Sequence, residues 1–350
     1  MTTSPSNKRV RLGFIGAGGM AAAHLHGLGN PELFPDVELV AFCDLVLERA
    51  RAQATPFGSP AFDSPAKMIA EVELDGCYIL LPPFAHGDAE RACLEGNVPF
   101  FVEKPIGLDG ALCREIKEEV ARRDLLTSTG YMLRYQPSVQ AAKAAFAGER
   151  AAIAYGGWFD PPPLRSHPDF AAGLINRWWS HKEKSGGQMV EQVTHTVDLA
   201  RYFLGDAVEV YAHATHAFNT ERPDIAPGYN IADAMTTSIC FQSGAIASLM
   251  SSVASTATDS IFLDIWGTRT LAKFTQWQHH LELVSQGEEP RRVEGTVDIF
   301  AREDRAFVDA LKSGDRSLVL IPYADAYKTL LLTLAANRSA ETGKPVDLTT

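Results

Sequence analysis

The feature that most constrains this chain is a glycine-rich turn that directly follows a short apolar segment near the N-terminus. The apolar segment, 12–15, predicts a buried strand, and the alanine-rich segment 20–28 predicts a helix. Between them, Gly16, Gly18 and Ala21 follow the spacing G-x-G-x-x-[G/A], which binds dinucleotides when a strand precedes it and a helix follows. Gly16 permits the sharp turn, Gly18 lets the backbone approach a pyrophosphate, and Ala21 lets the helix pack on the strand. The helix N-terminus then offers unpaired N–H groups to the phosphates.

The next expected strand, 38–43, ends on an acidic residue. Asp44 follows it directly, where a carboxylate accepts hydrogen bonds from the adenosine ribose hydroxyls and repels a 2′-phosphate. Leu45 adds no positive charge for a phosphate, although Arg49 or Arg51 could relax the preference. The sequence therefore predicts NAD as the cofactor, with NADP less favoured.

Composition bounds the size, the partners and the compartment of the protein. The chain has 350 residues, which predicts two domains. Its net charge of −11 argues against a nucleic-acid partner, and no apolar stretch approaches the roughly 20 residues that cross a bilayer. Residues 1–8 lack the apolar segment of a signal peptide. The five cysteines are scattered without C-x-x-C spacing, which predicts buried thiols in the cytoplasm.

Strands and helices alternate from the N-terminus to about residue 132. Further buried strands are expected at 76–81, 98–102 and 126–131, with helices between them. This alternation predicts an α/β domain over 8–132 that is built on a doubly wound parallel sheet. Ligands bind such a sheet at the carboxyl ends of its strands. The other residues expected at those ends are Pro82, His86 and Lys104.

From residue 133 the pattern changes, and it predicts a second domain over 133–350. Strand-like segments follow one another through short turns, which favours a large, mostly antiparallel open sheet. Two helical stretches are expected beside it, one over 188–204 and one from about 301 that breaks near 313–315. The expected strands are 151–159, 208–217, 232–241, 245–253, 261–266 and 271–274.

Lys104 closes an expected strand between Glu103 and Pro105. A lysine at the mouth of a nucleotide-binding fold can hold a substrate hydroxyl through a charge-assisted hydrogen bond. Partial burial would also lower its pKa toward a role in proton transfer. Lysines are usually solvated at the surface, but the position at a strand end favours a catalytic role.

The helix expected over 188–204 carries a second candidate group. Glu191 and His195 are four residues apart and would be neighbours on one helix face, with Asp198 three residues further on. The carboxylate can orient the ring, and the histidine titrates near neutral pH and can move a proton. A structural histidine is the alternative that these residues leave open. No metal site is predicted, because a third ligand is not evident and H-E-x-x-H is absent.

A polar loop contains Arg177, Trp178 and Trp179. Exposed tryptophans often stack on sugar rings, and arginine supplies donors to hydroxyls or carboxylates. Tryptophans in such a loop are as often part of a core or a subunit interface. We interpret the three residues as candidate substrate contacts and leave that alternative open.

Taken together, these segments resemble the Gfo/Idh/MocA oxidoreductases, the family of glucose–fructose oxidoreductase and inositol dehydrogenase. The resemblance covers nearly the whole chain. Its most specific part is the strand end Glu103-Lys104-Pro105 combined with a downstream Gly-Gly…His-x-x-Asp helix. The matching segments are 16–21, Asp44, 82–86, 103–105, 130–135, 186–198, 335–339 and 343–346.

The resemblance implies that Lys104 and His195 are catalytic, and that the Lys104–Pro105 bond is cis. It also implies that Glu103 and His86 lie near the nicotinamide ribose. Glu191 stands where the family usually has aspartate; it keeps the charge but reaches farther, so its catalytic contact with substrate or with Lys104 differs. The implied cofactor-binding residues are Gly16, Gly18, Gly19, Met20, Asp44, Pro82, His86, Glu103 and Arg134.

The sequence thus predicts an NAD-dependent dehydrogenase that transfers a hydride between nicotinamide and a secondary hydroxyl or carbonyl of a sugar, inositol or other polyol. A homodimer or homotetramer is expected from the resemblance, without a nucleic-acid or membrane partner. Two alternatives come from other classes: a glycoside hydrolase that uses NAD transiently, and a non-enzymatic NAD-binding sensor. Retention of both Lys104 and His195 argues against the sensor.

Overall fold

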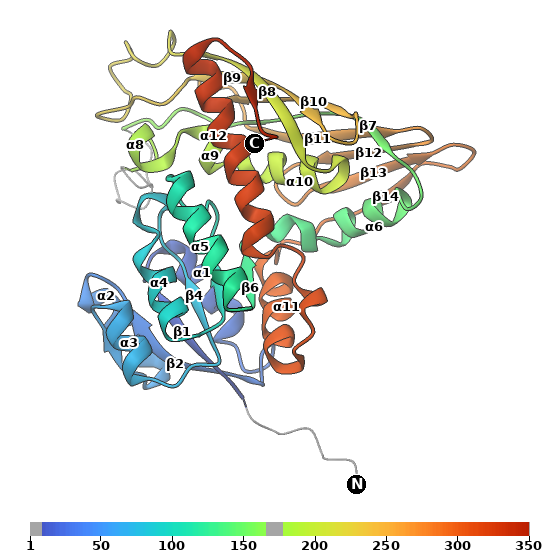
Figure 1. The fold of residues 1–350 in the computed structure, drawn as a ribbon. Helices are drawn as coiled ribbons and strands as arrows, with labels where there is room; N and C mark the ends of the chain where they lie inside the picture. The colour runs from blue at the N-terminus through green and yellow to red at the C-terminus, as the bar shows by residue number, and fades with distance from the viewer. Residues whose placement is uncertain (1–8, 166–177, 350) are drawn as a thin grey trace. The chain divides into compact units, whose positions relative to one another are not determined.

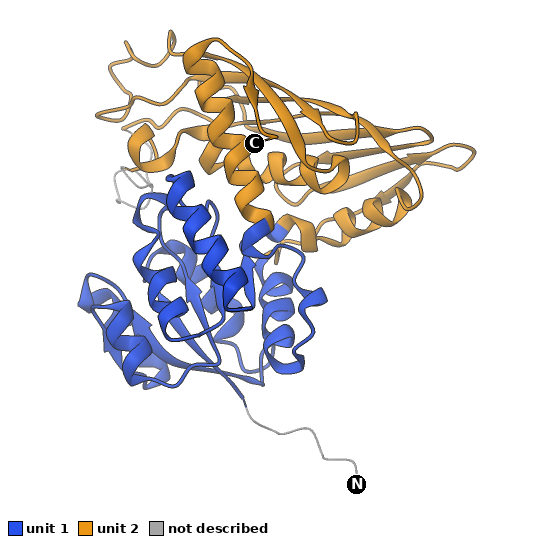
Figure 2. Ribbon diagram, in the orientation of Figure 1, with its two compact units in different colours: residues 1–132, 300–324 blue, residues 133–299, 325–350 orange. Residues whose placement is uncertain are grey.

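A computed structural model describes residues 9–165 and 178–349 of the chain. They form two compact units, one of residues 1–132 with 300–324 and the other of residues 133–299 with 325–350 (Figure 2). The sequence predicted a second domain that continued without interruption from 133 to 350. The structure instead returns 300–324 to the first unit, because the helix over 300–313 packs against the first helix and the first strand of that unit.

The first unit is built on a six-stranded sheet of parallel strands (Figure 1). Its order, β3-β2-β1-β4-β5-β6, is that of a doubly wound dinucleotide-binding fold, in which the direction of winding reverses between β1 and β4. The predicted fold class of this unit is confirmed. The strands are β1 (Val10–Ile15), β2 (Val37–Cys43), β3 (Ala61–Phe62), β4 (Gly76–Ile79), β5 (Phe100–Val102) and β6 (Thr127–Thr129).

The helices of the first unit begin where the sequence supplies caps. The Ser64 hydroxyl accepts a hydrogen bond from the Lys67 N–H at the start of one helix, and Asp109 caps another in the same way. Phe307 and Val308 bring the last helix of the unit into its hydrophobic core. The helices are α1 (Gly19–Leu28), α2 (Leu47–Ala54), α3 (Pro65–Glu71), α4 (Asp88–Glu95), α5 (Gly110–Arg122) and α11 (Phe300–Ser313).

The second unit contains a nine-stranded sheet in the order β14-β13-β12-β11-β7-β10-β9-β8-β15 (Figure 1). Neighbouring strands are antiparallel except β7 and β10, which run parallel, so the predicted mostly antiparallel sheet is confirmed. The sequence analysis missed β13, β14 and β15. The strands are β7 (Ala151–Phe159), β8 (Ala207–Thr215), β9 (Ala234–Phe241), β10 (Ile246–Ser252), β11 (Ser260–Gly267), β12 (Thr270–Thr275), β13 (His280–Ser285), β14 (Arg291–Val293) and β15 (Val346–Asp347).

The single helix predicted over 188–204 is wrong, because the structure divides it in two. The Val193 N–H bonds to the carbonyl of Gln188, five residues back, and the His195 N–H bonds to that of Gln192, three residues back. The regular four-residue ladder is therefore interrupted between Glu191 and Thr194. The helices of the second unit are α6 (Pro137–Ala145), α8 (Lys182–Ser185), α9 (Gln188–Glu191), α10 (Thr194–Leu204) and most of α12 (Tyr323–Thr342).

Two further expectations need correction. By length and composition, the segment 316–342 is apolar enough to cross a membrane, with a mean hydropathy of 1.3 over its most apolar window. Because 56% of that window is buried inside the protein, we interpret it as a core helix. Among the cysteines, Cys240 is exposed on β9, whereas the other four are buried as predicted.

Candidate functional site

The glycine turn between β1 and α1 requires glycine at one position and leaves open space at two others. Gly16 has a φ of +101°, and a Cβ atom there would lie 2.3 Å from the carbonyl oxygen of Leu80. At Gly18 and Gly19, an added Cβ atom would meet no atom of the described structure within 4 Å. The backbone is thus closed onto the end of β4 at Gly16 and open to a ligand at the next two glycines.

The first turn of α1 borders this open space. Gly18 is its N-cap and provides no side-chain cap, so the first N–H groups of the helix are left for a ligand. Met20 is exposed, whereas Ala21 is fully buried against the sheet, as the motif predicts. Open backbone, unpaired N–H groups and the positive end of the helix dipole suit a pyrophosphate.

Asp44 stands beside the turn at the end of β2. Its Oδ2 accepts a hydrogen bond of 2.9 Å from the Ala17 N–H, and its Oδ1 accepts one of 2.8 Å from the Val46 N–H. The half-buried carboxylate is therefore fixed next to the glycine turn. In that place it can accept hydrogen bonds from the ribose hydroxyls of NAD, and it would repel the 2′-phosphate of NADP. The residues present fit NAD.

Pro82 and His86 lie in the segment after β4, where Pro82 precedes the short turn Pro83–Ala85. His86 is buried, with its Nδ1 2.5 Å from Glu90 Oε1 and its Nε2 3.1 Å from the Leu81 carbonyl oxygen. Burial alone would raise the pKa of Glu90, but the charge and hydrogen bonds of His86 hold it below the usual value. His86 therefore shapes this segment through both ring nitrogens, and its contact with the nicotinamide ribose stays a prediction.

Glu103 and Lys104 follow β5, and the Lys104–Pro105 bond is cis, as the resemblance implied. Glu103 is 3% exposed and its carboxylate turns inward: Oε2 accepts a hydrogen bond of 2.9 Å from the Lys104 N–H, and Oε1 lies 3.1 Å from His24 Nε2. Lys104 itself is half-buried. The strand end thus holds the lysine backbone from inside the unit, at the edge of the sheet where the nucleotide turn also lies.

In the second unit, Glu191 ends α9 and is half-buried. Its Oε2 accepts a hydrogen bond of 2.7 Å from the Trp179 indole N–H. The sequence placed Glu191 and His195 as neighbours on one helix face, but the break after α9 puts them in different helices. Of the candidate substrate residues, Trp178 and Trp179 are half-buried in a turn, and Arg177 lies outside the described residues.

His195 lies in the first turn of α10 and packs against two indole rings that also contact each other. The Trp158 ring is stacked on it, with centroids 5.8 Å apart and an interplanar angle of 25°, and the Trp277 ring meets it edge-on at 5.6 Å. His195 is only 3% exposed. This packing fixes the plane of the imidazole, which a residue that transfers a proton requires.

Asp160 adds a carboxylate beside this aromatic group. Its Oδ2 accepts hydrogen bonds of 2.7 Å from both the Trp158 indole N–H and the Gln192 amide. Burial raises the pKa of Asp160 although these two bonds oppose the shift. Flat aromatic faces next to carboxylate acceptors suit a ligand that carries ring carbons and several hydroxyl groups.

Asp198 and Arg134 form a buried ion pair within the second unit. Two N–H···O bonds of 2.6 and 2.7 Å join them, and a second carboxylate, Asp325, lies 2.7 Å from Arg134 Nη1. Burial alone would lower the pKa of Arg134, but the two carboxylates raise it well above the usual value. The structure therefore shows Arg134 and Asp198 tying α10 to α12, and a contact of Arg134 with the cofactor stays a prediction.

Sequence reasoning missed several residues that the structure brings to these sites. Trp158 precedes Asp160 by two residues at the end of β7, a spacing that puts both side chains on the same side of an extended chain. Asp304 interrupts the apolar side of α11 between Phe300 and Phe307, where an acid is unexpected. Those signals were in the sequence, whereas the contact of Trp277 with His195 joins positions too far apart to be read from it.

Comparison with known families matches both units. Residues 10–131 match an oxidoreductase family described by its NAD-binding Rossmann fold, and residues 163–272 match the GFO/IDH/MocA C-terminal domain. Together these matches cover more than half of the chain. The cofactor of the first unit is NAD.

Characterised relatives extend over nearly the whole chain. A myo-inositol 2-dehydrogenase of Thermotoga maritima is 25% identical over 97% of this chain and 98% of its own length. A scyllo-inositol 2-dehydrogenase (NAD(+)) of Bacillus subtilis is also 25% identical, over 97% and 96%. Among solved structures, levoglucosan dehydrogenase in complex with NADH and L-sorbose superposes with a TM-score of 0.83 at 20% identity, covering 97% of this chain and 99% of that one. This last likeness shows the shared fold.

Proposed function

Because the chain belongs to the GFO/IDH/MocA family of oxidoreductases and its first unit binds NAD, we propose that it oxidises a secondary hydroxyl of a sugar, an inositol or another polyol. The observation that carries the proposal is Lys104, half-buried at the end of β5 at the sheet edge that also bears the nucleotide turn. Bound NAD⁺ supplies the hydride acceptor. Orienting the hydroxyl and removing its proton are left to the protein.

Lys104 and His195 share these two tasks in the proposed reaction. The Lys104 ammonium donates a hydrogen bond to the hydroxyl oxygen and stabilises the negative charge that develops as the proton leaves. His195 accepts the proton, and the indole rings around it keep its imidazole in one orientation.

The surroundings of His195 support a polyhydroxylated substrate. Asp160 offers a carboxylate that accepts hydrogen bonds, next to the buried rings of Trp158 and His195. The hydrogen-bonded pair of Trp179 and Glu191 gives a second aromatic ring and a second acceptor, and Glu191 precedes His195 by four residues. Two of the relatives described above are named for the oxidation of inositols, which makes inositols the first substrates to test.

The test is to incubate the purified protein with NAD⁺ and a panel of inositols, aldoses and linear polyols while following NADH absorbance. We expect NADH with at least one substrate. Lys104→Ala should lower kcat about 100- to 1000-fold, the cost of removing one donor to a developing oxyanion. NADH affinity, measured by fluorescence titration, should stay within about twofold, because ground-state binding of the cofactor does not use the lysine.

Lys67→Ala is the matched control, since Lys67 is an exposed lysine of the same unit that pairs with the neighbouring surface acid Asp63. Two outcomes would contradict the proposal. Cleavage of a glycoside at catalytic amounts of NAD⁺ without net NADH would indicate a hydrolase. NAD binding without turnover of any substrate would indicate a sensor.

We also propose that the protein is a cytoplasmic homodimer or homotetramer that assembles through the large sheet. Ile153 and Ile246 are register neighbours on β7 and β10 and are 40% and 51% exposed, with Tyr155 two residues along the same face. Exposed apolar side chains on one sheet face are typical of a subunit interface. Light scattering should give a particle mass of more than one chain. The double variant Ile153→Lys with Ile246→Lys should lower that mass toward the mass of the monomer.

A further inference from the structure

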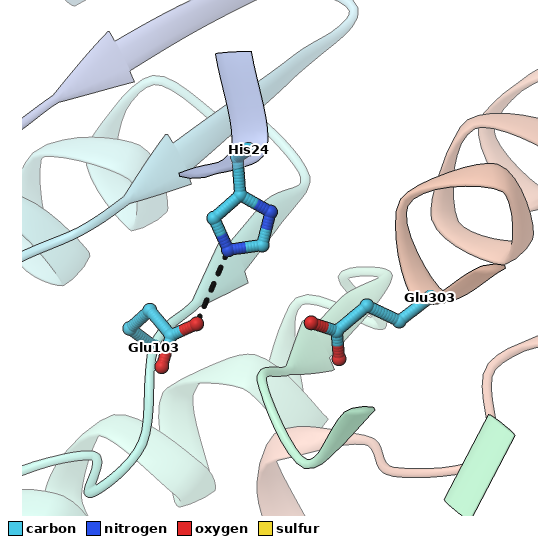
Figure 3. Close-up of side chains that lie close together, drawn as sticks. All are labelled: His24, Glu103 and Glu303. Atoms are coloured by element: carbon cyan, nitrogen blue, oxygen red, sulfur yellow. Dashed lines mark hydrogen bonds and ion pairs between the residues drawn. The ribbon is translucent and has the colours of Figure 1, made fainter. Parts of the chain in front are cut away.

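A cluster of buried ionisable side chains lies inside the first unit, and Figure 3 shows three of them, His24, Glu103 and Glu303. At its centre is His24 on α1, which is completely buried. Its Nε2 lies 3.1 Å from Glu103 Oε1, and its Nδ1 lies 2.7 Å from Asp304 Oδ1 on α11. Two carboxylate oxygens face the two ring nitrogens, so both contacts are satisfied when each nitrogen carries a proton.

The rest of the His24 surroundings is aromatic. The rings of Tyr78, Phe101 and Phe300 lie with their centroids 5.5, 5.1 and 5.3 Å from the imidazole. In such an environment an unpaired charge is costly, so the imidazole and the two carboxylates depend on one another for their charges.

The charge states of the cluster follow from burial and from these contacts. Burial alone would lower the pKa of His24, but the charges and hydrogen bonds of Asp304 and Glu103 raise it well above its usual value. Glu303 is also completely buried, and neither of its carboxylate oxygens has a hydrogen-bond partner among the described residues. Burial and the neighbouring acids raise the pKa of Glu303, although His24 opposes them.

The cluster reaches Lys104 through Glu103. While Oε1 of Glu103 faces His24, Oε2 accepts the hydrogen bond of the Lys104 backbone N–H. A Cβ atom at Gly130 would lie 2.6 Å from Glu103 Oε1, so the carboxylate packs directly on the backbone there. With both oxygens engaged and the neighbouring backbone against it, the carboxylate has little freedom to move.

We propose that His24, held by Asp304, is a positioning residue that fixes Lys104 through the Glu103 carboxylate. The inference rests on the catalytic role proposed above for Lys104. The contacts run in one line: Asp304 accepts from His24 Nδ1, His24 Nε2 donates to Glu103, and Glu103 accepts from the Lys104 N–H. Loss of the His24 charge would free the carboxylate and, with it, the backbone that directs the lysine.

A bound metal ion is the competing interpretation of the same side chains. One nitrogen of His24 and oxygens of Glu103 and Glu303 lie within 4.8 Å of one another, close enough to surround a cation. However, His24 Nε2 and Glu103 Oε1 already lie at hydrogen-bond distance, and an ion between them would have to separate them. The geometry therefore favours a proton, and the experiment below includes the metal as an outcome.

The kinetic arm compares two isosteric changes on α11. Asp304→Asn removes the charge that keeps His24 protonated, and we expect kcat to fall about 100-fold, as for a small misplacement of a catalytic group. NADH affinity should stay within about twofold, and Asp304→Glu should recover part of the lost kcat. Glu303→Gln is the matched control: it keeps the shape of a buried neighbour that takes no part in the contacts from Asp304 to Lys104, and kcat should stay within about twofold. Equal losses in Asp304→Asn and Glu303→Gln would overturn the proposal.

The second arm needs no turnover, so it separates failure of this proposal from failure of the proposed function. In protein labelled with ¹⁵N-histidine, the His24 signals, assigned by their loss in His24→Gln, should show both ring nitrogens protonated at neutral pH. In folded Asp304→Asn, the same signals should instead be those of a neutral His24 ring. An unprotonated ring nitrogen in the wild type would overturn the proposal. So would one equivalent of a divalent metal that is found by mass spectrometry and is lost in His24→Gln.

Discussion

At the scale of single residues, Asp44 both shapes its site and selects its ligand. Its two oxygens hold the backbone N–H groups of Ala17 and Val46, so it fixes the glycine turn before any cofactor arrives. The same carboxylate is the group that discriminates between a ribose hydroxyl and a phosphate. A substitution there changes the shape of the turn and the choice of cofactor together, and the two effects can be separated.

We expect Asp44→Ser to lower kcat/KM with NAD⁺ about 10- to 100-fold, the worth of hydrogen bonds to a charged acceptor. Its activity with NADP⁺ should rise or fall far less, because the repulsion of the 2′-phosphate is gone. Initial rates with both cofactors test this. Asp44→Asn is the control that keeps an acceptor oxygen beside Ala17 while it removes the charge. An equal loss with both cofactors in Asp44→Ser would show that Asp44 only shapes the turn.

At the scale of elements, the glycine turn between β1 and α1 has one glycine that matters for folding and another that matters for cofactor binding. Gly16→Ala would place a Cβ atom 2.3 Å from the Leu80 carbonyl oxygen at a φ of +101°, and should lower the free energy of unfolding by about 1–3 kcal/mol. Gly18→Ala meets open space, so it should unfold like the wild type but bind NADH more weakly. Chemical denaturation and NADH titration of both variants measure the two effects. A normal NADH affinity in Gly18→Ala would place the pyrophosphate elsewhere.

An ionic contact between Asp36 and α11 adds to the packing of this helix on the first unit, and it can be tested by pH. Asp36, just before β2, pairs with Arg305 at 2.9 Å and with Lys312, both on α11. Burial would raise the pKa of Asp36, but these two partners lower it to about 2. Since the folded pKa lies below the unfolded one, this contact stabilises the fold above about pH 4 and is lost as the pH falls toward 2.

We therefore expect Asp36→Asn to be less stable than the wild type by about 0.5–1 kcal/mol at pH 7, a small value because the pair is partly exposed to solvent. The difference should shrink as the pH is lowered from 4 toward 2. Urea unfolding followed by circular dichroism at several pH values tests this. Asp309→Asn, on the same helix, is the comparison variant. A difference independent of pH would mean that Asp36 acts through packing.

The elements also show what the sequence could and could not predict. Local patterns were sufficient for most strands of both sheets. They failed at β14, which is short and contains two arginines, and at the break between α9 and α10, where a uniformly helical pattern conceals a disturbed ladder. The cluster around His24 joins α1, β5 and α11 over 280 residues of sequence, and no local pattern carries that information.

At the scale of the whole molecule, each unit contains a buried histidine, and the pKa values of the two are shifted in opposite directions. All five tryptophans of the chain lie in residues 158–277 and so in the second unit, which makes their fluorescence a reporter of that unit alone. The first unit contains His24, whose pKa is raised by its carboxylate partners. The second contains His279, which is 1% exposed and whose pKa burial lowers to about 4. The two histidines therefore act on stability in opposite directions.

The direction in which His279 changes the stability of the second unit with pH follows from proton binding. Between the unfolded pKa of about 6.5 and the folded pKa of about 4, the unfolded chain binds a proton that the folded unit does not, so stability falls as the pH is lowered through this range. The full effect is on the order of 3 kcal/mol. Urea unfolding of the second unit, followed by tryptophan fluorescence, should thus shift to lower midpoints from pH 7 to pH 4.

His279→Asn is the variant that isolates this effect. The position has a φ of +54°, which asparagine tolerates better than most residues, and the amide can replace the hydrogen bond from Nδ1 to the Trp277 carbonyl oxygen without titrating. We expect its unfolding midpoint to change much less with pH than that of the wild type, so that the wild type loses stability relative to the variant as the pH falls toward 4. Parallel curves would show that His279 is not the group responsible.

The same variant also tests the proposed base, because Trp277 packs on His195. A lower kcat in His279→Asn would indicate that the contact between Trp277 and His195 supports the reaction.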